Sequence, residues 1–342
     1  MKHNYKKFLG LALAFLLTQA GLQAQSFGPV GKIDAASDAS TYLQNYLEPV
    51  VVSASNGLAN GWITTAKPHK LFGFDVTATL SIAGIPDAAY SFAFNSTDNS
   101  YGSIRLEDGS GNIINGEVPT LAGGDPIDGY QIAILDENGT ATGDSFTPIA
   151  GQNFEDFPVI RGGLPIPMLN VGFGLPKNTE IKLRLIPLGQ LGDDIALNGS
   201  FGVGVLHDVK QWIPGMKLVP IDISAFVGYN QFKMNYAVAD GSFAEFTSRA
   251  TTFQLLTSKK LLFFTPYLGL GFNAISSSLD FRATDPDDNS NFVEGNFDYE
   301  NIGGARLTIG GRLKILWILS LNVDYTIQRY NTLNVGFGIN FR

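Results

Sequence analysis

The chain has 342 residues, with 23 Lys and Arg against 31 Asp and Glu, and its formal net charge is −8. This acidic balance argues against a nucleic-acid partner, which requires a basic surface. The lack of cysteine excludes disulfides, thiolate metal sites and a lipoprotein anchor. The 39 Gly, 25 Phe and 12 Tyr residues, together with many short alternating segments, indicate an all-β protein.

Segment 1–24 is predicted to be a signal peptide. Three lysines precede the apolar run Phe8–Leu17, and Ala24 offers a small residue for cleavage. The alternative is a membrane anchor, but the apolar run is shorter than the roughly 20 residues that a transmembrane helix needs. We therefore expect an exported protein.

Segment 25–70 is predicted to be an N-terminal helical segment. Apolar residues between Ser37 and Gly57 recur at intervals of three and four, which is typical of a helix, and Pro49 is expected to break or restart it. The segment has two interpretations: it lies in the periplasm beneath a barrel, or it enters the barrel lumen as a plug. The candidate plug residues are Tyr42, Leu43, Tyr46 and Leu47.

Segment 71–342 is predicted to form a barrel. From Ile318 to Gln328 apolar and polar residues alternate without interruption, which predicts a strand with one apolar face. The same period gives about nine strands from Ile166 onward and one more at 72–82, whereas the signal weakens between Ile85 and Arg161. Because single-chain bacterial barrels usually have even strand numbers, we expect about 14 strands, with about 12 as the alternative.

Two features favour a transmembrane antiparallel β-barrel over a soluble β-sandwich. The strands have about ten residues, the length needed to cross a bilayer at a tilt, whereas sandwich strands typically have about five or six. Their polar faces combine small residues with charges of both signs, as a barrel lumen does. The candidate lumen or ligand residues are Asp75, Asp222, Asn230, Arg306, Arg312 and Asp324.

Two predicted strands break the alternation. In 221–238 the apolar residues change from odd to even positions, which we interpret as a β-bulge near Asn230. In 266–281 the residues Leu279 and Phe281 are also out of phase.

The lengths of the connections indicate the orientation. Short connections near 175–179, 257–261 and 314–318 fall on one side of the barrel, so we expect this side and the C-terminus to face the periplasm of a gram-negative bacterium. The longer connection 207–218 is expected to place Trp212 at the membrane interface.

Three motifs carry a resemblance to known proteins. Asn60-Gly61-Trp62, His207–Pro214 and Asp222–Ala225 resemble an uncharacterised family of exported outer-membrane β-barrel proteins. In layout the chain is also similar to the long-chain fatty acid transporter family, which transports hydrophobic compounds. That resemblance implies an N-terminal hatch and sideways release of ligands from the lumen into the membrane. The Asn-Pro-Ala sequence of that family is missing here.

No catalytic arrangement and no cofactor are predicted. His207 and Asp208 are adjacent on a strand and therefore point to opposite faces, and His69 is interpreted as a loop residue. A carboxylate-rich loop offers oxygen ligands for calcium but lacks EF-hand spacing, so no metal site is predicted. This weak calcium candidate consists of Asp285, Asp287 and Asp288.

The sequence therefore leads to two functional hypotheses. The first is passive transport of small hydrophobic molecules across the outer membrane, with membrane lipid and a hydrophobic small molecule as partners. The second is a non-transporting partner or scaffold barrel of an outer-membrane assembly or secretion complex, with other outer-membrane proteins as partners. An enzyme is not expected.

Overall fold

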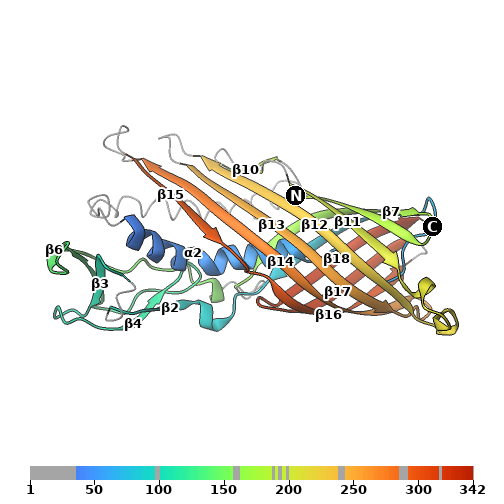
Figure 1. The fold of residues 1–342 in the computed structure, drawn as a ribbon, viewed down its shortest axis with the longest axis horizontal. Coiled ribbons are helices and arrows are strands. Elements are labelled where there is room, and N and C mark those ends of the chain that lie inside the picture. The colour runs from blue at the N-terminus through green and yellow to red at the C-terminus, as the bar shows by residue number, and fades with distance from the viewer. Residues whose placement is uncertain are drawn as a thin grey trace.

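The computed structural model describes residues 36–96, 101–156, 162–186, 189–191, 195–197, 200–237, 243–284, 292–315 and 318–341. Within these residues, ten antiparallel strands close into a barrel. Helix α2 (Ala36–Ala59) runs from a group of short strands outside the barrel into its interior (Figure 1).

The barrel strands are neighbours in the order β11-β8-β7-β1-β18-β17-β16-β14-β13-β12, and the pairing of β12 with β11 closes the ring. Closure leaves no unpaired edge, which is the condition for a sheet in lipid. The strands are β1 (Phe74–Ala83), β7 (Leu164–Leu175), β8 (Thr179–Leu185), β11 (Phe201–Asp208), β12 (Asp222–Ala237), β13 (Phe243–Ser258), β14 (Phe264–Thr284), β16 (Gly304–Ile315), β17 (Leu319–Ile327) and β18 (Thr332–Phe341).

The expected count of 14 strands, or 12, is wrong. The strand at 72–82 and the strands predicted from Ile166 onward all join the barrel as expected. The error comes from segment 84–163, whose short strands pair with one another and not with the barrel. Weak alternation there reflects strands too short to cross a bilayer.

Segment 84–163, which we call the insert, connects β1 to β7. It contains two small sheets and packs against the first half of α2 through an apolar core. Its elements are β2 (Ser91–Phe94) with β4 (Gly116–Pro119), β3 (Ile104–Glu107) with β5 (Gln131–Leu135) and β6 (Ala141–Phe146), and the 3-10 turns η3 (Asp87–Ala89) and η4 (Phe154–Asp156).

The two ends of the barrel differ in their connections. The insert lies at one end, which we call the long-loop end. Here β15 (Phe292–Tyr299) pairs with the last part of β14 from Ser277 to Thr284, and the hairpin of β9 (Gly189–Leu191) and β10 (Ile195–Leu197) extends the wall beside β12. The opposite, short-turn end carries the connections β7–β8, β13–β14 and β16–β17, and the longer β11–β12 connection with η5 (Lys210–Trp212) and η6 (Met216–Leu218).

Helix α2 continues through Pro49, contrary to the expected break. Proline removes one backbone hydrogen bond, but Pro49 is buried, and the helix is packed on both sides of it through Tyr46 and Val51. Among the helices that the structure describes, none is both long and apolar enough to cross a bilayer.

No β-bulge lies near Asn230, because β12 pairs with β13 residue by residue along its whole length. Even-numbered residues of β12 face inward throughout, so Val227 lies on the outer face and Phe232 and Met234 point into the barrel. In β14 the odd-numbered residues face inward throughout, so Leu270 lies outside and Leu279 lies inside. The change of polarity therefore marks the level at which α2 replaces the polar lumen with apolar surface.

Candidate functional site

The lumen is the candidate site, because the chain's own N-terminal part passes through it. We call residues Ser53–Lys70 the luminal segment; it comprises the end of α2 and the extended chain that leads to β1. The part of it nearest the long-loop end is hydrogen-bonded to the barrel at several points. The Ser53 hydroxyl donates to the Ala83 carbonyl at 2.6 Å, the Ser55 and Ser277 hydroxyls are 2.8 Å apart, and the Asn56 amide donates to the Ile302 carbonyl at 3.2 Å.

Two arginines meet the C-terminal end of α2. The Arg184 guanidinium donates to the Leu58 carbonyl at 2.8 Å. The Arg306 guanidinium donates to the Ala59 carbonyl at 3.4 Å and to the Asn60 side-chain oxygen at 2.6 Å. The last carbonyls of a helix carry partial negative charge and lack helical donors, so positive side chains from the wall fit this end.

The chain turns sharply directly after the helix. Gly61 has φ 70°, a conformation that favours glycine, and a Cβ there would lie 2.8 Å from Thr79. Trp62 then stacks under Arg184, whose guanidinium carbon is 3.7 Å from the ring centroid. A Cβ on Gly202 would lie 2.8 Å from this ring, so a bare backbone makes room for the indole.

The extended part of the luminal segment continues toward the short-turn end. The Thr65 and Ser258 hydroxyls are 3.2 Å apart, and the Ser224 hydroxyl donates to the Ala66 carbonyl at 2.5 Å. Lys67 and Asp222 form a loose, half-exposed pair at 4.0 Å. Wall contacts therefore continue along the whole segment.

A buried charged cluster ends the luminal segment. His69 Nε2 lies 2.8 Å from Asp75 Oδ1, and the His69 backbone N–H donates to Glu180 Oε2 at 2.8 Å. The Lys182 ammonium is 2.6 Å from the other Glu180 oxygen. Potential metal-ligating atoms of His69, Asp75 and Glu180 lie within 4.8 Å of one another. Lys182 already supplies a cation to the carboxylates, so we interpret the cluster as a latch between the segment, β1 and β8.

A second polar network crosses the wall near Arg306. The Tyr267 hydroxyl donates to one oxygen of Asp324 at 2.8 Å, and the Asn334 amide donates to the other at 2.7 Å. The buried Asp324 is thus hydrogen-bonded at both oxygens, as a buried carboxylate requires.

The half of the lumen nearest the long-loop end is apolar. Wall side chains such as Phe232, Met234 and Phe246 belong to the same buried apolar cluster as Val52 and Leu58 of the second half of α2. The lumen therefore changes along its axis, from an apolar chamber filled by the helix to a mostly polar channel filled by the extended chain. One apolar cluster remains in this channel, where Trp62, Ile63 and Ala66 lie with Leu206, Phe226 and Leu256.

The predicted lumen residues are placed as follows. Asp75, Arg306 and Asp324 lie in the networks above, and Arg312 is buried on the inner face. Asn230 is also buried on the inner face, whereas Asp222 lies half-exposed near the short-turn end.

The plug candidates Tyr42, Leu43, Tyr46 and Leu47 lie in the first half of α2. The Ile149 N–H donates to the Tyr42 hydroxyl at 3.0 Å, and the Tyr46 hydroxyl donates to the Ala150 carbonyl at 2.8 Å. Both tyrosines therefore bind the insert. The calcium candidates Asp285, Asp287 and Asp288 lie outside the described residues.

Sequence reasoning missed Glu180, Lys182 and Arg184, and it treated His69 as a loop residue. A signal was present, because Ile181, Leu183 and Leu185 alternate with these three charged residues, which places the charges together on the opposite face of the strand. Consecutive inward charges of both signs on a short strand mark a position that faces another part of the chain.

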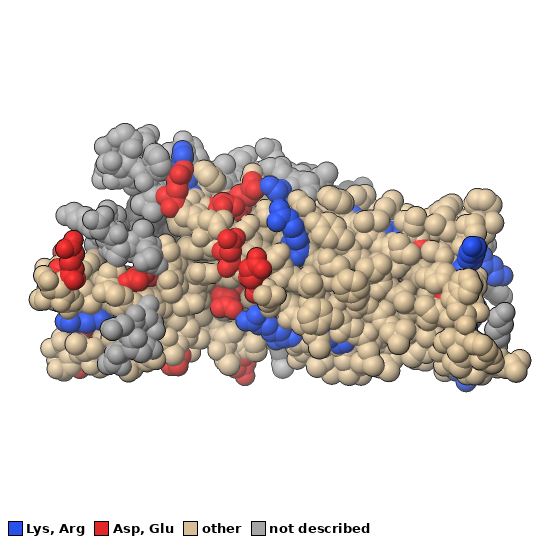
Figure 2. All heavy atoms as spheres, viewed as in Figure 1, with Lys and Arg blue, Asp and Glu red and all other residues tan. Residues whose placement is uncertain are grey.

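Charge is distributed unevenly along the molecule. Figure 2 shows acidic side chains together with several basic ones over the half toward the insert. Beyond them lies a wall that is largely free of charge, and basic side chains lie at the opposite end. Exposed lysines of the short-turn end are Lys70, Lys177, Lys259 and Lys260.

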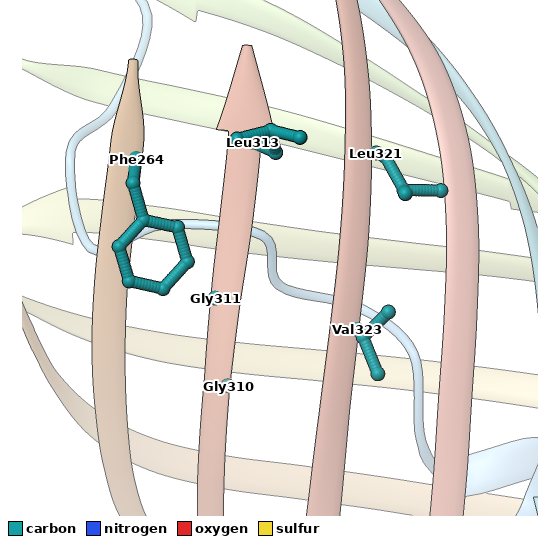
Figure 3. Close-up of a pocket in the computed structure, with 6 residues that line it drawn as sticks. All are labelled: Phe264, Gly310, Gly311, Leu313, Leu321 and Val323. Atoms are coloured by element: carbon teal, nitrogen blue, oxygen red, sulfur yellow. The ribbon is translucent and has the colours of Figure 1, made fainter. Parts of the chain in front are cut away.

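An apolar groove of about 410 Å³ lies on the outer wall across β14, β16 and β17 (Figure 3). Gly311 leaves the space, with the Phe264 ring on one side and Leu321 and Val323 on the other. Phe264, Leu321 and Val323 are exposed on the outer face, so the groove belongs to the outer surface and not to the lumen.

A family profile described as "Family of unknown function (DUF6588)" matches residues 1–341. No curated protein matches the chain.

Several solved structures resemble the fold at low similarity. The attachment invasion locus protein Ail of Yersinia pestis has 8% identity and a TM-score of 0.27, with 79% of this chain and 100% of that chain covered. Neisserial surface protein A has 9% identity and a TM-score of 0.25, covering 78% and 96%. The transport unit of the autotransporter AIDA-I from Escherichia coli has 11% identity and a TM-score of 0.29, covering 88% and 99%. These likenesses concern the barrel alone, and they give no support to the fatty acid transporter resemblance.

Proposed function

This chain belongs to the family of unknown function DUF6588, and we propose that it is a gated outer-membrane barrel for passive passage of small hydrophobic molecules. In this proposal the short-turn end and the C-terminus face the periplasm of a gram-negative bacterium. The luminal segment closes the lumen and moves aside for passage. No enzymatic step, cofactor or nucleic acid takes part.

The outer wall supports the membrane location. Large apolar side chains alternate outward along every neighbouring strand, for example Phe337 at 51%, Leu270 at 59% and Leu183 at 51% exposure. In water such a belt is costly, whereas in lipid it is the expected surface of a closed barrel. The inward residues that alternate with this belt are buried, and most of them are polar or glycine.

The gating proposal rests on one observation. The lumen is filled by the luminal segment, and not by side chains of the barrel wall. Several of the segment's hydrogen bonds to the wall join small polar groups, such as Ser55 with Ser277 and Thr65 with Ser258. Each such bond contributes only about 0.5–1.5 kcal/mol net. Displacement of the helix would leave an apolar chamber lined by Phe232, Met234 and Phe246, which matches a hydrophobic solute.

A reversible lock tests this proposal. The chain has no cysteine, so S55C/S277C introduces a single disulfide between α2 and the wall at a site where the native hydroxyls are 2.8 Å apart. In liposomes we expect the oxidised variant to retain a small amphiphilic dye that lipid alone retains, and reduction to restore release.

The matched control is S248C/S277C, which joins two neighbouring wall strands at hydroxyls 3.0 Å apart. Its oxidation is expected to leave dye release unchanged. Equal release from oxidised and reduced S55C/S277C would contradict gating by the luminal segment.

A scaffold barrel is the second candidate, favoured by apolar turns at the short-turn end. Leu218, Leu262 and Phe72 are 91%, 85% and 73% exposed. If these turns bind another membrane protein, L262S/F72S would abolish its co-purification from mildly solubilised membranes while dye release stays at the wild-type level. Unchanged co-purification would count against the scaffold.

A further inference from the structure

The arginines at the end of α2 have unusual surroundings for buried charges. Arg184 is 1% exposed and forms no ion pair with the described residues. Its Nε donates to the Asn170 side chain at 2.9 Å and one terminal nitrogen donates to the Leu58 carbonyl. The other terminal nitrogen has no hydrogen-bond partner among the described residues.

Arg306 is similar. It is 6% exposed, its terminal nitrogens bind Asn60, Ala59 and neutral wall side chains, and its Nε has no partner among the described residues. Asp324 attracts it electrostatically, but both oxygens of Asp324 already accept hydrogen bonds from other groups.

The two guanidiniums are also close enough to repel one another. What offsets this repulsion is the helix end, whose carbonyls carry about half a negative charge. A buried charge that loses its partner costs several kcal/mol. When the helix end leaves, the pair therefore favours a negative group in its place.

We propose that Arg184 and Arg306 form a binding site for a small oxyanion, which the end of α2 covers in this conformation. The inference rests on the proposed function, because it requires the luminal segment to leave. The anion and the helix end compete for the same donors, so the anion favours the open lumen. The molecule that passes, or the ion that opens the gate, then carries an anionic group.

Thiol labelling tests the competition without any measurement of transport. Ser55 is fully buried, so in the full-length single-cysteine variant S55C a maleimide reacts only after the segment is displaced. Inorganic phosphate should raise the labelling rate by the factor 1 + [phosphate]/Kd, about threefold at twice the Kd. R184Q/R306Q should abolish the dependence on phosphate, whatever its basal rate.

The control is R282Q, which removes an exposed arginine that pairs with Glu294 outside the lumen; it should keep the full phosphate effect. If S55C perturbs folding, S53C places the thiol two residues earlier in α2, at an equally buried site. A labelling rate independent of phosphate, or no labelling at all, overturns the anion site. Failure of the S55C/S277C lock to block dye release would instead overturn the gate and leave the phosphate effect standing.

Discussion

Contacts of three kinds hold single residues of the luminal segment in place: the arginines on the helix end, the turn at Gly61, and the latch around His69. Alternation along a strand predicted that Arg306 faces inward, because the period of a strand assigns each residue to a face. It did not identify the partner, since Asn60 comes from a segment that is 246 positions away in the chain. Sequence patterns of short range carry no such information.

The turn at Gly61 gives a prediction about stability. Replacement of Gly61 by alanine should cost about 1–2 kcal/mol for the left-handed backbone and about 1–3 kcal/mol more for the contact with Thr79. Gly215 is the control, because it also has a positive φ, 78°, but open space around it. Thermal unfolding followed by circular dichroism should show a larger loss for G61A than for G215A; equal losses would contradict the crowded turn.

The latch gives a second prediction. K182M leaves the buried carboxylate of Glu180 without its ammonium, which should cost about 3–5 kcal/mol. The double variant E180Q/K182M removes both charges and should be more stable than K182M alone. Chemical denaturation of the three proteins measures this, and a double variant no better than K182M would exclude a charged latch.

At the scale of elements, the change of polarity along β12 and β14 was predicted as a bulge or a slip, and the real cause lies outside the strands. Helix α2 fills the half of the barrel nearest the long-loop end, and the inward residues of the wall there are apolar. The outward residues at this level lie beyond the membrane and are polar. Strand periodicity alone cannot distinguish a shift in register from a change in which the inner face becomes apolar and the outer face polar. Both move the apolar residues by one position along the strand.

This interpretation predicts where the membrane ends. Leu270 and Ser278 lie on the outer face of the same strand, on opposite sides of the polarity change. L270R should cost about 2–4 kcal/mol for a charge facing lipid, whereas S278R should cost little. Folding titrations in liposomes compare the two, and similar costs would place the membrane boundary elsewhere.

The contact between α2 and the insert should weaken in alkali. Burial raises the pKa of the Tyr42 and Tyr46 hydroxyls, so folding favours their neutral forms. Their contribution to stability is complete below the unfolded pKa of about 10 and declines as the pH rises above it. The unfolding temperature of the wild type should fall across this range more steeply than that of Y42F. The variant Y325F, on the outer wall, is the control. Parallel curves for the wild type and Y42F would contradict the prediction.

At the scale of the whole molecule, the barrel class and the inward face of most barrel strands could be predicted from the sequence. The second halves of β12 and β14 and the number of strands could not. The barrel strands cross a bilayer and therefore show an unbroken period. The insert forms small sheets with a core of their own, and its turns look like hairpins of a barrel from the sequence alone. Acidic residues in it greatly outnumber Arg105 and Arg161, its only basic residues, which fits a part held away from the lipid.

The chain's own residues 53–70 pass through the barrel, and disulfide mapping in native membranes tests this arrangement most directly. S55C/S277C and T65C/S258C join the segment to the wall near its two ends, where the native hydroxyls are 2.8 and 3.2 Å apart. S55C/V227C, which pairs the same helix position with an outward residue of β12, is the control. We expect near-complete disulfide formation in the first two variants and none in the control. Free thiols in both lumen variants of the folded protein would contradict it.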